Sequence, residues 1–381
     1  MVNNQQADTS PPAVPNPFQD RDSFTKECET PFVSKNLGFV DISDAYDQLY
    51  TKLVDKFPDA SDGWKELVKN SFDGAATDAA MAQKTDKAEY HGIEHSFKVI
   101  IAKMHDLHER MEAGEDIRPN KAMEEVFQAA VHDRGHDRTG NMRNDGEGKR
   151  VWQVNDLENQ SINIATELVN NSKLEPNEKT EVWERLVPVI SVTDATPVCV
   201  GFTANGPINT TSLPFPDMYP PFYDVVQAAS DFHRKADDVN SQRGYFELRD
   251  ETMSALEEKW GNSMLGEGAK NVLRKRVHEL MDPLHGPEIT KMASSMINAD
   301  HFASLNVSEN VSRHETKGIL AETQNITNPT PQQVEGCSAF YRNNIAKYIP
   351  DQELSQAEIN VAPALQMAQT ARAKVGGMKN A

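Results

Sequence analysis

Cysteine is scarce in this chain. Only Cys28, Cys199 and Cys337 occur among 381 residues, and no CxxC pair is present. Because the number is odd and the three lie far apart, the sequence argues against a disulfide framework and for a reducing compartment. A run approaching the ~18 apolar residues of a membrane span is also missing, and residues 1–17 lack the apolar core of a secretory signal. These absences predict a cytoplasmic protein, with export by a route that reads no N-terminal signal left open.

Positive charge is in short supply: 39 Lys and Arg face 58 Asp and Glu, for a net charge of -19. An acidic field of this size repels nucleic-acid backbones and anionic lipid surfaces. We therefore expect no nucleic-acid partner and no membrane partner. The densest basic run, Lys270 to Arg276, is interpreted as one solvated helix face. The hydrophobic fraction of 38 % is low, so either the surface is very polar or part of the chain is unfolded.

Residues 1–40 are rich in proline and polar side chains, which predicts a flexible tail. From Asp41 onward, apolar residues recur at three- and four-residue steps, the period of amphipathic helices. Helices are expected from about 41, and over 90–111, 121–131, 157–169, 181–192, 222–239, 248–260, 267–281 and 287–303, with a long loop over 198–221. In the second helix, His105 and His108 fall on the polar side and are expected to be solvated. The predicted fold class is all-α.

Two short segments concentrate histidine and aspartate. His91 and His95 are four residues apart, so in a helix they share a face. His132 stands beside Asp133 at the end of an apolar helix, with His136 one turn further on. Imidazoles and a carboxylate together suit Zn, Fe, Mn or Mg. An aspartate can bridge two cations, and a dinuclear site ~3.5–4 Å across can hold a hydroxide for attack on phosphorus.

The two segments resemble the HD-domain superfamily, in particular the catalytic domain of class I cyclic-nucleotide phosphodiesterases. Tyr90–Ser96 resembles that family's YHNxxHA motif, His132–Gly140 its HDxxHPG motif, Leu157–Asn159 its LEN segment, Val189–Asp194 its ILATD segment and Ala299–Ala303 its ADLSN segment. The five matches stand in the family's order and span about 90–305. The resemblance implies a helical bundle as one catalytic domain over 41–375.

The resemblance also implies a role for each matching residue. The implied ligands of the tighter metal are His95, His132, Asp133 and Asp300, and Asp133 would bridge to a second divalent ion. The implied catalytic residues are His91 as general acid, Asp194 near the attacking metal-bridging hydroxide, and Glu158 and His136 orienting water and the second-metal shell. Tyr90 and Phe340 are the candidates for contact with substrate. The implied activity is metal-dependent hydrolysis of a phosphodiester, with Zn, Mg, Mn or Fe as the two cofactor ions.

The match departs from the family where the substrate would bind. Gly92 replaces an asparagine, and no glutamine stands at the family's offset before Phe340. Asp194 and Asp300 are 106 positions apart, which implies an insertion over about 198–290 that caps the site or binds a protein partner. The resemblance itself implies a 3′,5′-cyclic nucleotide as the substrate. Another nucleotide, a cyclic dinucleotide or a protein-linked phosphodiester is the alternative.

Two further alternatives come from other classes of protein. His91 to His95 also spells HxxEH, the inverted zinc-protease motif, in which Glu94 would be the base. That interpretation leaves His132, Asp133 and Asp300 without a role. The acidic surface, the Pro-rich tail and the insertion would instead suit a non-catalytic effector or adaptor. Metal content and the effect of replacing Asp133 distinguish this last alternative from an enzyme.

Overall fold

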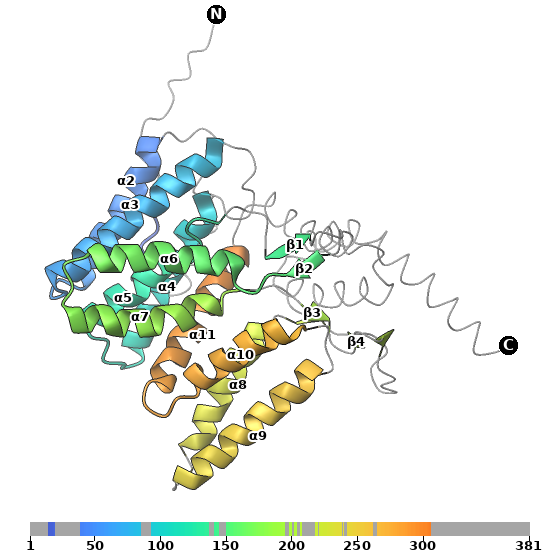
Figure 1. Ribbon diagram of the computed structural model, residues 1–381. Helices are drawn as coiled ribbons and strands as arrows, with labels where there is room; N and C mark the ends of the chain where they lie inside the picture. Colours follow the sequence, from blue (N-terminus) through green and yellow to red (C-terminus); the bar gives the residue numbers. More distant parts are fainter. Residues whose placement is uncertain are drawn as a thin grey trace, which may run out of the picture.

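The computed structural model describes residues 14–19, 39–84, 93–136, 141–144, 150–194, 198–199, 202–203, 206–207, 218–219, 221–237, 239, 242–261 and 265–305 (Figure 1). Its helices are α2 (Phe39–Lys56), α3 (Asp62–Lys84), α4 (Ile93–Glu112), α5 (Pro119–Val131), α6 (Asp156–Asn171), α7 (Pro176–Ser191), α8 (Pro221–Ala236), α9 (Gln242–Gly261), α10 (Glu267–Leu280) and α11 (Gly286–Leu305). The all-α class is confirmed. The predictions that concern Tyr90, His91, Phe340 and the residues after 305 lie outside the described residues.

Strands are short and confined to connections between helices. β1 (Met142–Asn144) pairs with β2 (Arg150–Trp152) as an antiparallel hairpin before α6. In the segment 198–221, expected as a loop, β3 (Val198–Cys199) pairs with β6 (Met218–Tyr219), and β4 (Phe202–Thr203) pairs with β5 (Gly206–Pro207). Each strand of this second group has two residues, so these pairs form no layer of the described fold.

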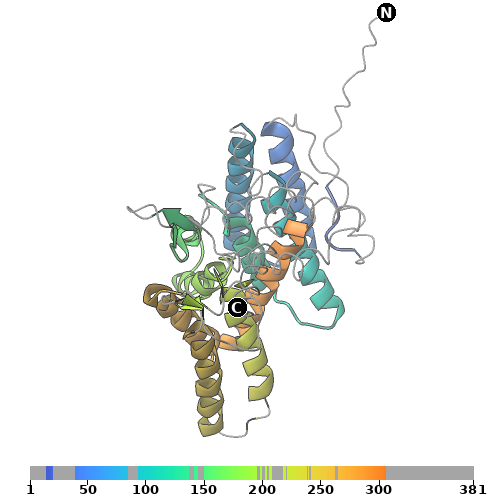
Figure 2. The ribbon, with the colours of Figure 1, turned by 90° about the vertical axis from the view of Figure 1, so that its right-hand side faces the viewer.

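The core lies where α3, α4, α5 and α11 pack together, and α2, α6 and α7 cover its sides (Figures 1 and 2). The apolar stripe predicted on α4 is buried, including Phe97, Ile100 and Met104. α5 begins at Pro119, whose fixed φ suits the first turn of a helix, and it is buried on nearly every side. α8, α9 and α10 form a second group that packs onto α7 and α11.

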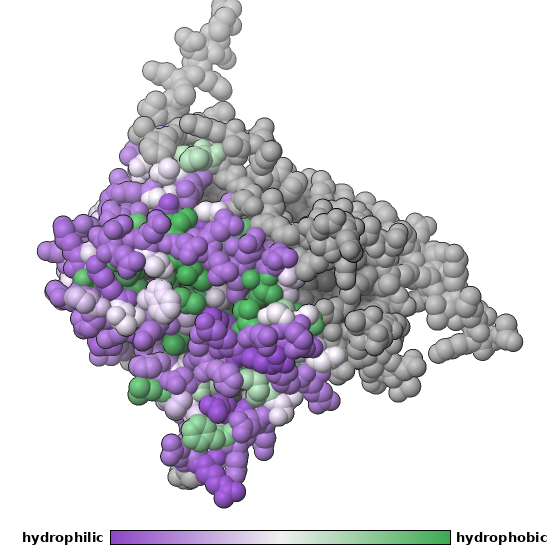
Figure 3. Space-filling view, viewed as in Figure 1, coloured by the Kyte–Doolittle hydropathy of each residue, from purple (hydrophilic) through white to green (hydrophobic). Residues whose placement is uncertain are grey.

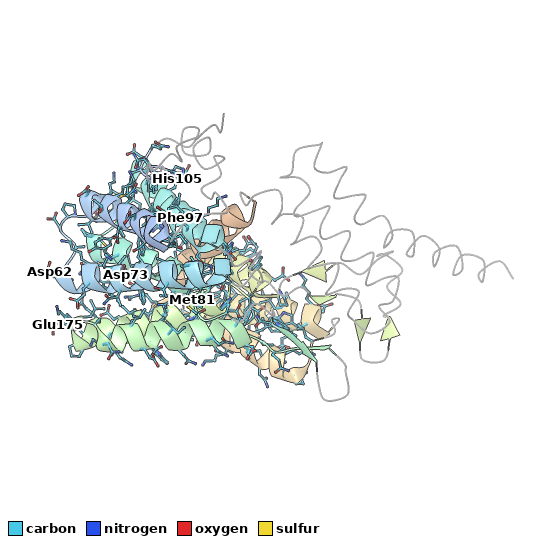
Figure 4. The ribbon with its side chains drawn as sticks, turned by 90° about the horizontal axis from the view of Figure 1, so that it is seen from above. Asp62, Asp73, Met81, Phe97, His105 and Glu175 are labelled. Atoms are coloured by element: carbon cyan, nitrogen blue, oxygen red, sulfur yellow. The ribbon has the colours of Figure 1, made fainter. Side chains whose placement is uncertain are left out.

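α4 and α11 run antiparallel. Lys103 in α4 contacts Ser295 in α11, and Glu115, just after α4, contacts Lys291 near the start of α11. The later a residue stands in or just after α4, the earlier its partner stands in α11. Figure 4 shows α4 through its labelled residues Phe97 and His105. This direction brings the start of α4 to the last turns of α11, the place where the predicted site requires them.

Part of the predicted tail is packed. The Phe18 ring lies 6.2 Å from the Phe57 ring and 6.3 Å from the His108 ring, and Pro17 is buried. The Nδ1 atom of His105 lies 3.1 Å from the carbonyl oxygen of Pro17. The expectation that His105 is solvated is wrong, because residues 14–19 cover that face of α4, and a helix pattern alone does not show which distant segment will do so.

The described surface is predominantly hydrophilic, with a few apolar patches (Figure 3). Among the expected solvated basic residues, Arg276 is the exception: it is 4 % exposed, lies on the inner face of α10 and pairs with Glu279, Nη1 to Oε2, at 2.8 Å. The prediction of a single solvated face is wrong at this residue, because Arg276 lies on the same buried side of α10 as Leu273 and Leu280. Within the described ranges, no helix combines the length and apolar character needed to cross a membrane.

Candidate metal centre

Three segments carry the predicted metal ligands to one place. His95 lies in the first turn of α4, and Asp300 lies near the end of α11, which the antiparallel packing brings opposite. His132 follows directly after α5, and Asp133 is the next residue in the turn that ends this helix. Because α5 packs against α4, its C-terminal end reaches the start of α4.

The four side chains point at one another. The Nε2 atom of His95 lies 3.0 Å from Asp133 Oδ2 and 3.1 Å from Asp300 Oδ1. The Nε2 atom of His132 lies 3.1 Å from Asp133 Oδ2 and 4.0 Å from Asp300 Oδ1. Both imidazoles are 1 % exposed. His95, His132 and Asp300 each offer one ligand atom within 4.8 Å of the others, so this group could hold a metal ion.

The tautomer of His132 shows that the site suits a cation. Its Nδ1 atom lies 2.8 Å from the carbonyl oxygen of Ala129, and a carbonyl only accepts, so Nδ1 carries the hydrogen. In the neutral imidazole, Nε2 then presents a lone pair to the carboxylate oxygen of Asp133 at 3.1 Å. Two buried lone pairs that face each other repel unless a positive charge lies between them. Nitrogen and carboxylate ligands of this kind suit a divalent transition metal.

In the metal-free chain, a proton supplies the positive charge. Burial lowers the pKa of His95, but hydrogen bonds and charges from Asp133 and Asp300 outweigh burial and raise this pKa to about 10. Burial raises the pKa of Asp300, and His95 and His132 outweigh burial and lower it. Without a metal, the site is thus an imidazolium–carboxylate cluster, and a metal ion that bound there would displace the proton.

Family models, curated proteins and solved structures were compared with the chain, and none matches. The HD-domain assignment therefore rests on the five sequence segments. The geometry of the described residues is independent of that resemblance.

His136 lies beside Oδ1 of Asp133, the carboxylate oxygen that does not face His95 and His132. Its Nδ1 atom is 3.5 Å from Asp133 Oδ1, and its Nε2 atom is 3.0 Å from the Ser161 hydroxyl. Ser161 donates its single proton to the Arg134 carbonyl oxygen at 2.9 Å, so it must accept from His136 Nε2. The neutral His136 then presents the lone pair of Nδ1 to Asp133. Asp133 accordingly faces His136 with Oδ1, and both His95 and His132 with Oδ2.

Glu158 lies in the first turn of α6 and is buried beside this cluster. Asn141 donates from Nδ2 to Glu158 Oε2 at 2.9 Å and accepts from the backbone N–H of Leu157 at 2.9 Å. Burial, together with the charges of Asp194 and Asp133, raises the pKa of Glu158 well above its usual range, although the Asn141 hydrogen bond lowers it. A proton is therefore bound more tightly by Glu158 than by an ordinary glutamate.

Asp194 ends the segment after α7 and is fully buried. Its Oδ2 atom accepts from Trp152 Nε1 at 3.1 Å and from the backbone N–H of Asn155 at 2.9 Å. Asn155 has a φ of 58°, a left-handed conformation that asparagine tolerates, and its side chain donates to the Ser191 carbonyl oxygen at 2.6 Å. The β1–β2 hairpin and the start of α6 thus hold Asp194 within electrostatic reach of Glu158.

The structure brings together seven of the predicted site residues: His95, His132, Asp133, His136, Glu158, Asp194 and Asp300. His91, Tyr90 and Phe340 lie outside the described residues. Sequence reasoning missed Asn141, Trp152 and Ser161, which hold the carboxylates and imidazoles in place. Ser161 comes three residues after Glu158 on the buried side of α6, a spacing that could have indicated it; Asn141 and Trp152 carry no comparable signal.

Proposed function

We propose that this protein is a metal-dependent phosphodiester hydrolase with an HD-type helical centre. The observation that carries the proposal is the arrangement of Asp133, which faces an imidazole nitrogen with each oxygen while His95 and Asp300 complete one side. A carboxylate with imidazole nitrogens at both of its oxygens is an arrangement that would suit two divalent ions. The order of the five sequence segments supports the same assignment.

His95, His132, Asp133 and Asp300 would hold the first ion, and Asp133 with His136 would contribute to the second. Zn, Mn, Fe or Mg all fit this mixture of nitrogen and oxygen ligands. Bound there, divalent ions supply positive charge to a phosphate group and lower the pKa of water at the site.

The remaining residues handle orientation and protons. The Ala129 carbonyl oxygen and the Ser161 hydroxyl hold His132 and His136 in the tautomers that direct lone pairs inward. Protonated Glu158 donates a hydrogen bond to a water or a phosphate oxygen, and Asp194 accepts one. His91, four residues before His95, is the proposed proton donor to the leaving oxygen.

The substrate class within phosphodiesters follows from the sequence resemblance, which proposes a 3′,5′-cyclic nucleotide. Another nucleotide, a cyclic dinucleotide or a protein-linked phosphodiester would use the same centre. A panel of these compounds, tested at equal concentration, separates them: turnover of cAMP or cGMP alone selects the first.

The test of the hydrolytic centre is metal content measured together with hydrolysis of bis(p-nitrophenyl) phosphate. We expect purified protein to hold divalent metal and to cleave the diester, and Asp133→Ala to lose both. Asp73→Ala is the matched control, since Asp73 is an aspartate on the exposed side of α3. Wild-type protein that binds no divalent metal would refute the proposal. Loss of a peptidase activity in Glu94→Ala, with diester cleavage absent, would point to the protease alternative.

A further inference from the structure

The side chain of Arg134 extends from the turn after α5, where Asp133 also lies, to α3. Its Nε atom donates to Asp78 Oδ2 at 2.9 Å, a contact between residues 56 positions apart. Arg134 comes directly after Asp133, the residue at the middle of the candidate metal centre. The arginine therefore connects the backbone of a proposed ligand to a helix that contributes none of the proposed ligands.

α3 makes room for the guanidinium at Gly74. A Cβ atom at that position would lie 2.1 Å from Arg134 Nη1 and 2.4 Å from Cζ, far inside contact distance. The space above Gly74 is thus filled by the guanidinium. Glycine in the interior of a helix destabilises it relative to alanine, so its presence one helical turn before Asp78 has a steric reason here.

The backbone of the same turn is held from the opposite side. The Arg134 carbonyl oxygen accepts from the Ser161 hydroxyl of α6 at 2.9 Å. The next residue, Gly135, has a φ of +78°, and a Cβ there would lie 2.7 Å from Cδ1 of Ile164. Arg134, the residue that follows Asp133, is therefore held between α3 and α6, by its side chain on one side and its carbonyl oxygen on the other.

We propose that Arg134 is a positioning residue, and that its seat between Gly74 and Asp78 sets the direction of the Asp133 carboxylate in the metal centre. This inference rests on the proposed metal site and adds residues that the sequence motifs do not assign. A bridging aspartate must present both oxygens to its two partners, so a small rotation of its backbone changes the ligand geometry.

The contact affects geometry more than stability. The Asp78 side chain is 41 % exposed and that of Arg134 is 17 % exposed, and ion pairs in contact with water contribute little to folding. The atoms that a Gly74 methyl group would meet belong to the end of a flexible side chain, so the guanidinium can move aside without distortion of α3. Variants at this contact should therefore fold and still bind metal less well.

The experiment is a titration of metal-free protein with Co²⁺, whose visible absorption reports both affinity and coordination geometry. Gly74→Ala should weaken Co²⁺ binding by about 10- to 100-fold, the range for changes to groups that orient ligands, and shift the visible band. Arg134→Met, which keeps the aliphatic stem, should do the same. Arg134→Lys should recover part of the affinity, since it restores a cation opposite Asp78. Gly268→Ala is the control, because a Cβ at that helical glycine meets no atom within 4 Å.

The double variant decides the mechanism. If Gly74 acts only through the guanidinium, Gly74→Ala should have no further effect in the Arg134→Met background. Effects that add in the double variant, or an unchanged Co²⁺ affinity and spectrum in Gly74→Ala, would overturn the positioning role. Failure of the wild type to bind Co²⁺ would overturn the metal site itself, so the two failures are distinguishable. Thermal melts of each metal-free variant establish that the comparison is among folded proteins.

Discussion

The two ends of the α4–α11 pair both bury polar side chains, and they differ in the source of positive charge. At the end near His95, the ion pairs of Asp300 are with the imidazoles of His95 and His132. At the other end, Glu125 lies between two basic side chains, those of Lys103 and Arg110. The first end depends on a proton or an external cation, whereas the second is neutralised within the chain.

The second end forms a continuous network. Arg110 donates to Glu125 through Nη1 at 2.8 Å and Nη2 at 3.1 Å, and to Glu115 through Nε at 3.0 Å and Nη2 at 2.8 Å. Lys103 lies 2.8 Å from Glu125 and also donates to Ser295, which donates to Asp106 at 2.5 Å. Such a network holds α4, α5 and α11 in register. The comparison teaches that buried carboxylates alone do not mark a metal site, whereas carboxylates that face imidazoles, as Asp300 faces His95 and His132, are typical of one.

The largest effect on stability is expected at the end of the α4–α11 pair where Glu125 contacts Lys103 and Arg110. Glu125→Gln leaves the charge of Lys103, whose side chain is 1 % exposed, without its main partner. Breaking a buried ion pair in this way costs about 3–5 kcal/mol of folding free energy. Urea denaturation measures the loss, with Lys173→Ala, an exposed member of a surface pair, as the control that should change nothing measurable. The double variant Glu125→Gln with Lys103→Met should recover part of the loss; equal losses in single and double variants would contradict the pairing.

Acid should reduce the contribution of Glu125 to the free energy of unfolding. Burial raises the pKa of Glu125, but the charge of Lys103 and the hydrogen bonds and charge of Arg110 outweigh burial and lower it from 4.5 to about 2. A lowered folded-state pKa gives stability that is present above pH 4.5 and is lost as the pH falls towards 2. The stability advantage of wild type over Glu125→Gln should therefore shrink between pH 5 and pH 2. A difference that stays constant across urea titrations at these pH values would show that Glu125 is not ionised in the fold.

A smaller effect on stability is expected at the other end of the pair, where His95 and Asp300 form the candidate metal centre. Divalent metal at ~100 times its Kd should stabilise the wild type by about 2.7 kcal/mol, since it binds the folded state alone. Asp300→Asn should lose this stabilisation while the metal-free protein still melts cooperatively. Thermal melts with and without Zn²⁺ or Mn²⁺ measure both quantities. An equal rise in Tm for wild type and Asp300→Asn would exclude Asp300 as a ligand.

The smallest effect is expected at Trp152. Trp152→Phe keeps an aromatic ring against Phe222 and removes the N–H that Asp194 accepts. Diester hydrolysis should fall about tenfold, the lower end for groups that orient active-site residues, with metal content unchanged. A kinetic assay measures the loss of hydrolysis, and a metal determination on the same sample measures the metal content. Loss of bound metal in this variant would instead assign Trp152 to the integrity of the whole centre.

Much of the fold follows from local patterns. Apolar residues at three- and four-residue steps predicted α4 and α5 to within a few residues, because helical periodicity is a property of adjacent turns. The ligands that the resemblance implies, His95, His132 and Asp300, do converge. The environments of His105 and Arg276 were predicted wrongly, since each depends on a segment that packs from elsewhere in the chain.

The sequence by itself determined the helical class, the acidic surface and the residue types at the centre. Only the tertiary structure decided which oxygen of Asp133 faces which imidazole, that burial raises the pKa of Glu158, and that Gly74 provides the space for Arg134. The physical reason is distance along the chain. Helix propensity acts over a few residues, whereas tautomers, pKa values and steric fit depend on atoms that packing brings together from positions far apart.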